Sequence, residues 1–306
     1  MDSNRNINVH LGMIRCGSTT IQKALTRAEH LGAIKYLGFR PGPIETWYRS
    51  NLEADLIEKV IRFYHPVHFD RWLDNNVHLL ISDDDLRDIW LSNENFSGSC
   101  VWRENSVSTK IERIGRIFQG YQIKFDIVIR KFDDFARSLF FGYNKIGQVC
   151  DEYSFLTYIR RVRETGIIFQ LFPSYLHQLS REAGYDVTFF LTPLDYIESI
   201  AKKISCDKEI LYTAPENVSE SIVCLKSSKT IWSGIDKHRY LWSERNTISD
   251  EDFFSERKNL IYGHTKEPLS SDFISKFRDI FLYDIDEEKK YLSEQGLDHI
   301  SKFLFD

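Results

Sequence analysis

The amino-terminal segment constrains the fold most, because it has the pattern of a strand, a glycine-bounded loop and a helix. The run Ile7–Leu11 is short, β-rich and followed by Gly12, which predicts a buried strand. From Ser18 to His30 the apolar residues recur at helical spacing, and Ser and Thr stand where the helix begins. These elements in this order are typical of the opening of a nucleotide-binding α/β domain.

Strand and helix patterns continue to alternate as far as about residue 200, which predicts a parallel β-sheet flanked by helices. Further strands are expected at Ile34–Leu37, Val77–Ser82, Phe125–Arg130 and Val187–Leu191. Helices are expected at Trp47–Phe63, Thr109–Phe118, Phe132–Lys145, Phe155–Arg163 and Ser174–Ala183.

The remaining segments are expected to cover this sheet. The polar stretch between Leu91 and Val107 has the composition of a loop, such as a lid or an acceptor loop. From Lys202 onward the chain is charged and has weak strand signals, which favours helices. We therefore predict a single α/β domain over residues 1–306, with its core at residues 7–200 and a helical C-terminal cap at about 202–306.

Composition excludes several classes of function. The net charge of −5 and the pI near 6.0 argue against a chain that coats nucleic acid or an anionic membrane. The five cysteines are odd in number and form no CxxC pair, so neither a disulfide framework nor a thiolate metal site is expected. The N-terminus lacks a signal-peptide pattern, and no segment reaches the roughly 20 apolar residues that span a bilayer. We expect a cytoplasmic protein with no integral membrane segment and no bound metal; its oligomeric state is left open.

The segment from Gly12 to Thr19 has the spacing of a phosphate-binding loop. Its position between a strand and a helix lets backbone N–H groups and the helix dipole converge on an anion. A Walker A loop, however, requires Lys directly after the second glycine, where this chain has Ser18. A kinase or ATPase without that lysine is disfavoured, although a structural glycine turn stays open as an alternative.

A basic residue stands instead at Arg15, two positions before Gly17. With it, the stretch Val9–Gln22 resembles the 5′-phosphosulfate loop of the PAPS-dependent sulfotransferases, whose pattern is roughly G-x-x-K-x-G-[ST]-[ST]; PAPS is 3′-phosphoadenosine 5′-phosphosulfate. The resemblance is to bacterial carbohydrate and glycan sulfotransferases, and it implies a P-loop-type fold. It also implies that Arg15 stabilises the leaving group and that the backbone of Cys16, Gly17, Ser18, Thr19 and Thr20 holds the phosphosulfate.

A second segment matches the 3′-phosphate clamp of the same family. Arg130 ends a predicted strand and Ser138 follows eight residues later in a predicted helix, as in the R-x-x-x-D-x-x-x-S stretch of the bacterial enzymes. Arg can bind a phosphate through two parallel hydrogen bonds, and Ser adds a hydroxyl donor. The alternative is a solvated helix N-terminus. Two elements in the family's order, each at the carboxyl end of a strand, favour the nucleotide site.

The resemblance also implies a general base for the acceptor hydroxyl, and position-by-position matching puts it at Asp84. Asp84 would follow the predicted strand Val77–Ser82. An acidic N-cap of a following helix is an equal alternative. His10 and His78 are interpreted as core or lining residues of strands.

The resemblance thus implies an enzyme that moves a sulfuryl group from PAPS to a hydroxyl of an acceptor, in the class of saccharides or glycan precursors. The expected partners are the nucleotide donor and the glycan acceptor, with no nucleic acid and no metal. Two alternatives remain: a P-loop phosphotransferase that uses ATP, and a non-catalytic nucleotide-binding protein of the same fold.

Overall fold

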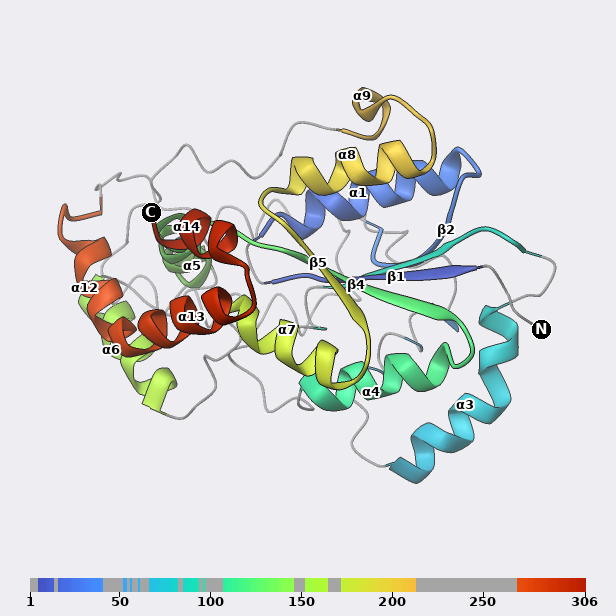
Figure 1. Ribbon diagram of the computed structural model, residues 1–306, viewed down its shortest axis with the longest axis horizontal. Helices are drawn as coiled ribbons and strands as arrows, with labels where there is room; N and C mark the ends of the chain where they lie inside the picture. Colours follow the sequence, from blue (N-terminus) through green and yellow to red (C-terminus); the bar gives the residue numbers. More distant parts are fainter. Residues whose placement is uncertain are drawn as a thin grey trace, which may run out of the picture.

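The computed structural model describes residues 5–13, 16–40, 52–53, 56, 60, 66–81, 85–93, 96, 107–145, 152–164, 172–212 and 269–306. Within them, five parallel strands form one sheet in the order β2-β3-β1-β4-β5 (Figure 1). The strands are β1 Asn6–Leu11, β2 Lys35–Gly38, β3 Ile89–Asn93, β4 Gln122–Val128 and β5 Asp186–Phe190. The predicted α/β class, a parallel sheet flanked by helices, is confirmed.

The central strand β1 pairs with β3 on one side and with β4 on the other. Ile7 lies beside Ile89 of β3 and beside Ile123 of β4. The chain therefore leaves β1 towards one side of the sheet and later crosses to the other side, so that a crevice is expected at the carboxyl end of β1.

Helices cover both faces of the sheet (Figure 1). On one face lie α1 Ser18–His30 and α8 Pro193–Lys203, which contact each other. On the other face lie α4 Val107–Ile117 and α7 Pro173–Glu182. Two further helices extend these layers. α3 Pro66–Leu80 places Phe69 against the guanidinium groups of Arg113 and Arg116 on α4, and the short α9 Lys208–Leu211 follows α8.

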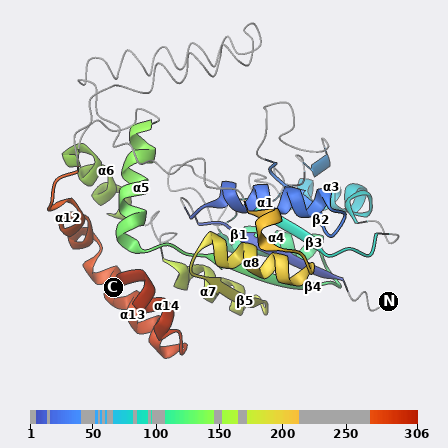
Figure 2. The ribbon, with the colours of Figure 1, turned by 90° about the horizontal axis from the view of Figure 1, so that it is seen from above.

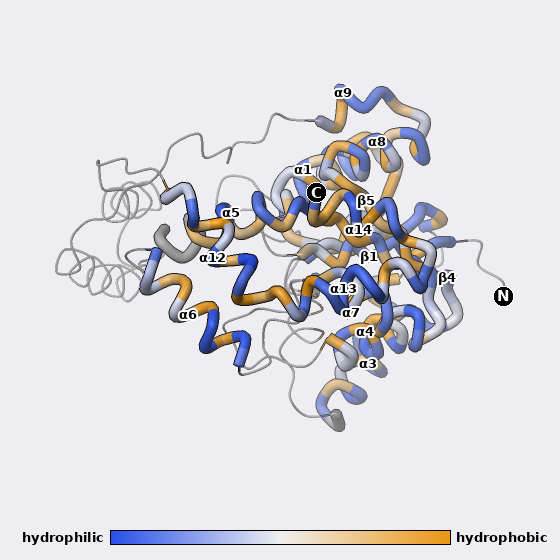
Figure 3. The backbone as a smooth tube through the Cα atoms, turned by 60° about the vertical axis from the view of Figure 1, so that its left-hand side comes forward, coloured by the Kyte–Doolittle hydropathy of each residue, from blue (hydrophilic) through white to orange (hydrophobic). Residues whose placement is uncertain are grey.

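The other helices gather beyond the carboxyl ends of the strands (Figures 1 and 2). They are α5 Phe132–Lys145, α6 Glu152–Glu164, α12 Phe273–Ile280, α13 Leu282–Glu294 and α14 Asp298–Phe305. Apolar stripes run along these helices (Figure 3). Phe132 is the centre of their packing, with ring centroids 5.5 to 6.0 Å from those of Phe172, Phe277, Phe281 and Phe305. Residues 269–306 are thus mainly helical, as expected for the C-terminal portion.

The predicted strand Val77–Ser82 is wrong, because Val77 to Leu80 form the last turn of α3. A short apolar run has no period that separates a strand from a buried helix segment. The run is not buried on both sides either, since His78 and Leu79 are exposed. The true strand is β3, which overlaps the start of the segment that was expected to be a loop.

The other elements lie near their predicted positions. The strands predicted at Ile34–Leu37, Phe125–Arg130 and Val187–Leu191 are β2, β4 and β5, displaced by one to three residues at their ends. The helix Phe132–Lys145 has its predicted bounds. Most of the predicted helix Trp47–Phe63 lies outside the described residues, although 52, 53, 56 and 60 are helical.

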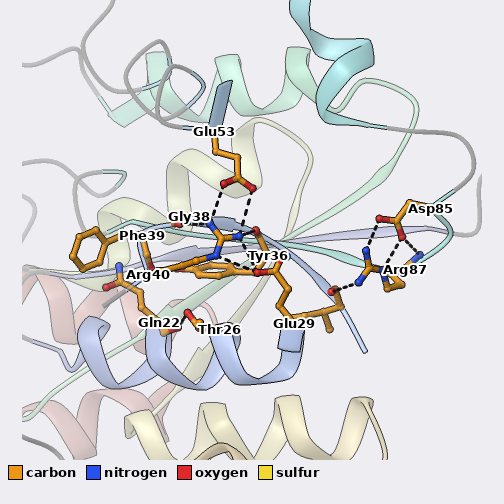
Figure 4. Close-up of polar contacts among 11 residues, drawn as sticks. Gln22, Thr26, Glu29, Tyr36, Gly38, Phe39, Arg40, Glu53, Asp85 and Arg87 are labelled. Carbon is orange, nitrogen blue, oxygen red and sulfur yellow. Dashed lines mark hydrogen bonds and ion pairs between the residues drawn. The ribbon is translucent and has the colours of Figure 1, made fainter. Parts of the chain in front are cut away.

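A buried ionic cluster fastens the end of β2 to α1 (Figure 4). Arg40 donates to the carboxylates of Glu29 and Glu53, each at 2.9 Å, and to the carbonyl oxygen of Tyr36 at 2.6 Å. The Arg40 side chain is only 9% exposed, and both carboxylates are 7% exposed. The cluster therefore holds two carboxylates out of water around one guanidinium.

We expect Arg40→Met to lower the free energy of unfolding by about 3 to 5 kcal/mol, because it leaves two buried carboxylates without their cation. The matched control is Arg116→Met, whose pair with Asp70 is half-exposed and contributes less than about 1 kcal/mol. Urea denaturation measures both. Equal losses in the two variants would contradict the prediction.

A buried carboxyl group fastens the C-terminal helices to α7. Glu288 of α13 accepts hydrogen bonds from the backbone N–H of Ser174, at 2.9 Å, and from its hydroxyl. Glu288 is 3% exposed, and burial raises its pKa to about 7 against the opposing effect of these hydrogen bonds. The carboxyl group thus retains its proton in the folded state at a pH where the unfolded chain has lost it.

Because the pKa of Glu288 is higher in the folded state, this group makes the protein less stable as the pH rises from about 4.5 to about 7. The full change is about 3 kcal/mol. Glu288→Gln keeps an acceptor for Ser174 but cannot ionise, so the fall in stability over this range should shrink by that amount. Urea denaturation from pH 5 to 8 tests this, with the exposed neighbour substitution Glu287→Gln as control; an unchanged pH dependence in Glu288→Gln would refute it.

Candidate functional site

The carboxyl edge of the sheet brings together four segments that are far apart in the sequence. β1 leads into the loop before α1, β3 ends at Asn93, β4 leads to Arg130, and β5 leads to Thr192 and Pro193. Leu11 and Asn93 are register neighbours, so Asn93 lies beside the end of β1, where the loop starts. Ligands of open parallel sheets bind at this edge.

The β1–α1 loop turns tightly before α1 begins. The N–H of Cys16 donates to the carbonyl oxygen of Met13 at 3.2 Å, and Gly17 has the left-handed φ of +81°. No acidic side chain lies in the first turn of α1, and its N-cap residue, Gly17, has no side chain that could cap it. The positive end of the helix dipole is therefore directed at this loop, which favours an anion there.

Gly17 also lies against the start of α8. A Cβ atom on Gly17 would come within 2.4 Å of Cγ of Pro193. α8 begins with Thr192 as N-cap, whose hydroxyl accepts from the N–H of Asp195 at 3.1 Å, and with Pro193 as its first residue. The loop and α8 thus touch at a point where only a glycine fits.

We expect Gly17→Ala to destabilise the protein more than Gly32→Ala. Both glycines have a left-handed φ, but nothing lies within 4 Å of a Cβ on Gly32. The backbone strain is about 1 to 2 kcal/mol in each variant, and the contact with Pro193 adds about 1 to 3 kcal/mol at Gly17 alone. Thermal or urea unfolding measures the difference, and equal destabilisation would show that the contact with Pro193 carries no energy.

Cys16 connects the loop with the segment after β4. Burial raises the pKa of its thiol to about 12, and the positive charge of Arg130 opposes that shift. Arg130 therefore lies close enough to act on the loop electrostatically. The thiol remains protonated and is 3% exposed, which excludes it as a nucleophile. Any contribution of Cys16 to anion binding would come from its backbone, whose N–H is already directed at Met13.

Arg130 and Lys131 lie where β4 turns into α5. The N–H of Ile129 donates to the carbonyl oxygen of Phe190 at 2.9 Å, which continues the pairing of β4 with β5. The Lys131 ammonium lies 5.9 Å from the ring centroid of Phe303 on α14. Arg130 and Lys131 are both exposed, and the positive charge of Arg130 acts on Cys16.

The structure brings together part of the predicted site. The predicted loop residues Cys16, Gly17, Ser18, Thr19 and Thr20 lie at or directly after the turn, and Arg130 is near them. Ser138 is half-buried in the second turn of α5, about 9 Å along that helix from its first residue. Arg15 lies outside the described residues.

The structural premise for Asp84 as the general base is wrong. The strand that was expected to carry it to the carboxyl edge is the end of α3, and Asp84 itself lies outside the described residues. Its neighbour Asp85 comes before β3, at the amino edge of the sheet, where a hydrogen bond from Arg87 lowers its pKa to about 2. Asp88 lies at the same edge and accepts from the N–H of Asn6 at 2.9 Å.

The two histidines that were interpreted as core or lining residues of strands lie in different surroundings. The Nδ1 atom of His10 lies 2.8 Å from the Ser92 hydroxyl, and burial lowers the pKa of His10 to about 3. This confirms His10 as a buried residue of β1. His78 lies on α3 and not on a strand, and it is exposed.

Asn93 and Pro193 are residues of this edge that the sequence analysis missed. A signal for Pro193 is present, because Thr192, Pro193 and Asp195 form a helix-start pattern directly after a strand. A signal for Asn93 is weaker, because the run Ile89–Asn93 mixes strand-forming and polar residues.

No protein-family model matches the chain, and no curated protein matches it. In the described residues, no three His, Cys, Asp or Glu side chains gather in a way that would hold a metal ion. None of the helices in those residues has the length and apolar character needed to cross a bilayer.

Proposed function

We propose that the chain is a sulfotransferase of the P-loop type, which moves a sulfuryl group from PAPS to a hydroxyl of an acceptor. The observation that carries the proposal is the parallel pairing of β1 with β4, because it brings the β1–α1 loop and the segment that leads to Arg130 to the same edge of the sheet. It means that the two segments with sulfotransferase-like patterns are neighbours in space. A glycine loop that served structure alone would not require a cation at this point.

The strand order supports the same proposal. β1 lies between β3 and β4, so the β1–α1 loop and the segment after β4 flank the crevice at which open α/β sheets bind nucleotides. The donor has phosphate groups at both ends of its ribose. The loop and the uncapped start of α1 would hold the 5′-phosphosulfate, and Arg130 with Ser138 would hold the 3′-phosphate.

The proposed reaction is an in-line transfer. An oxygen of the acceptor hydroxyl forms a bond to sulfur while the bond from sulfur to the bridging oxygen breaks, and adenosine 3′,5′-bisphosphate (PAP) leaves. Arg15 would neutralise the charge that develops on the bridging oxygen, and the backbone N–H groups of the loop would stabilise the rest. The hydroxyl proton would pass to a general base, for which the resemblance gives Asp84; this residue lies outside the described residues. The acceptor class proposed is a saccharide or glycan precursor, by resemblance of the motifs.

A second candidate is a nucleotide-binding protein of this fold without transferase activity. It is favoured by one observation, that Asp85, the described residue of the acidic turn expected beside the donor, precedes β3 at the opposite edge of the sheet and pairs with Arg87. An ATP-dependent phosphotransferase is a weaker alternative, because Ser18 replaces the lysine that its β- and γ-phosphates need.

The decisive experiment is calorimetric titration of the full chain with PAP and, separately, with ATP and Mg²⁺. We expect PAP to bind without any requirement for Mg²⁺. Arg130→Ala should weaken this binding about 10- to 100-fold, because hydrogen bonds to a charged phosphate contribute about 1.5 to 3 kcal/mol. The matched control is Lys131→Ala, which removes the adjacent cation that lies against Phe303.

Binding of ATP–Mg²⁺ in place of PAP would overturn the proposal in favour of a phosphotransferase. If Arg130→Ala and Lys131→Ala weaken PAP binding equally, Arg130 has no specific role in binding the 3′-phosphate. PAP binding without release of PAP from PAPS, in the presence of a panel of saccharides, would favour the binding protein over the enzyme.

A further inference from the structure

The two faces of the sheet differ in polarity. The face under α4 and α7 is apolar along the central strands, with Ile7, Val9, Leu11, Ile123, Phe125 and Ile127. The face under α1 and α8 has polar residues at the alternating positions: Asn8, His10, Ser92, Lys124 and Asp126. A parallel sheet covered by helices on both sides is normally apolar on both. Buried polar residues at positions that are normally apolar are expected at functional sites.

Part of this polar face opens into a pocket beneath the C-terminal half of α8. Its volume is about 270 Å³, and its lining includes Asn8, Trp90, Lys124, Asp126, Ser199 and Lys203. The first residues of β1, β4 and β5 also line it, so it lies towards the amino edge of the sheet. It is therefore separate from the site around the β1–α1 loop.

Two side chains in the lining have buried polar atoms without a partner among the described residues. They are Oδ1 of Asp126, an acceptor, and Nε1 of Trp90, a donor. Asp126 is 3% exposed and Trp90 is 2% exposed. Unsatisfied buried polar groups are rare in proteins, and each costs about 1 to 3 kcal/mol. Two of them on one pocket indicate that something supplies the missing hydrogen bonds.

The residues behind the pocket hold these groups in place. The Tyr196 ring lies 5.3 Å from the ring of His10 and 6.0 Å from that of Trp90, centroid to centroid. Burial raises the pKa of Asp126 to about 6, and Lys124, the Tyr196 hydroxyl and Lys203 oppose this shift. The Tyr196 hydroxyl is thus near Asp126, and it too is buried without a hydrogen-bond partner of normal geometry among the described residues.

The lining of the pocket contains equal numbers of basic and acidic side chains. The basic ones are Lys124 and Lys203, and the acidic ones are Asp126 and Asp186. Lys203 is also held in place, since it bonds to Asp88 at 2.8 Å and to Asn8 at 3.1 Å, and lies over the Trp90 ring at 5.3 Å. An anion would meet the two aspartates and a cation would meet the two lysines, so the lining favours a neutral ligand.

We propose that this pocket binds a small neutral ligand with adjacent hydroxyl groups, of the size of a monosaccharide or a cyclitol. One hydroxyl would donate to Oδ1 of Asp126, and a neighbouring hydroxyl would accept from Nε1 of Trp90. A hydroxyl can do both, whereas an ether or an ammonium group can do only one. The volume limits the ligand to about one ring, because pockets for larger ligands exceed about 300 Å³.

The test follows the indole N–H resonance of Trp90 in the full chain by NMR, identified as the peak that Trp90→Phe removes. The probes are D-glucose, myo-inositol and, separately, inorganic phosphate. We expect glucose or inositol to shift this resonance to saturation, and phosphate to leave it unchanged. Asp126→Asn should weaken the binding at least tenfold.

A matched pair of substitutions on α8 tests whether the shift of the Trp90 resonance comes from binding in the pocket. Ser199→Phe places a ring in the pocket and should abolish the shift, whereas Lys202→Phe, on an exposed position outside the lining, should preserve it. The proposal is overturned if neither sugar moves the resonance, if phosphate alone moves it, or if the shift survives in Ser199→Phe. Should Ser199→Phe fail to fold, Asp126→Leu decides, because it removes both acceptor oxygens and keeps the approximate size of the side chain.

Discussion

All five strands of the sheet run in the same direction, and this decides where the chain can form a site. Each connection between parallel strands has to cross a face of the sheet, so every strand ends at one edge. The central position of β1 then makes its crossover helix α1 lie on the opposite side of the strand from the segment after β4. Gly17, Asn93, Arg130 and Pro193 become neighbours for this reason, although no local sequence pattern links them.

The helix α8 bounds both of the places at which a ligand is proposed. At its first residue, Pro193 rests on Gly17 of the β1–α1 loop, and near its other end Ser199 and Lys203 roof the polar pocket. The helix is about 16 Å long, so the two sites are well separated. The eleven residues of α8 thus border one proposed site at the carboxyl edge of the sheet and the other at the amino edge.

Local patterns sufficed to predict the α/β class, the β1–α1 element and the bounds of α5, because strand runs, glycines and helical spacing act within a few residues. They failed at Val77–Ser82, where the same apolar run fits a strand or the end of a helix, and so Ile89–Asn93 was missed. Asp84 was expected directly after that strand, and its role stays a prediction because it lies outside the described residues. The fit of Gly17 against Pro193 depends on long-range packing, which sequence spacing does not express.

The polar face of the sheet, in contrast, is readable in the sequence. Asn6, Asn8 and His10 alternate with Ile7, Val9 and Leu11, which is the pattern of a strand with one polar and one apolar side. The apolar half of this pattern was recognised as a buried strand. Asn8 and His10 of the polar half are buried as well, because α8 covers them, and a local pattern does not contain this long-range packing.

The pairing of β1 also has a consequence for how the protein is made. β1 is synthesised first among the strands, yet its neighbours in the sheet begin at residues 89 and 122. A strand without its neighbours has exposed hydrogen-bonding groups on both sides and can pair with other chains. The first strand must therefore stay unpaired with other chains until β4, which ends at Val128, has been synthesised. A circular permutant that begins just before β3 would make β3 and β4 ahead of β1, so that both neighbours would be present when β1 is made.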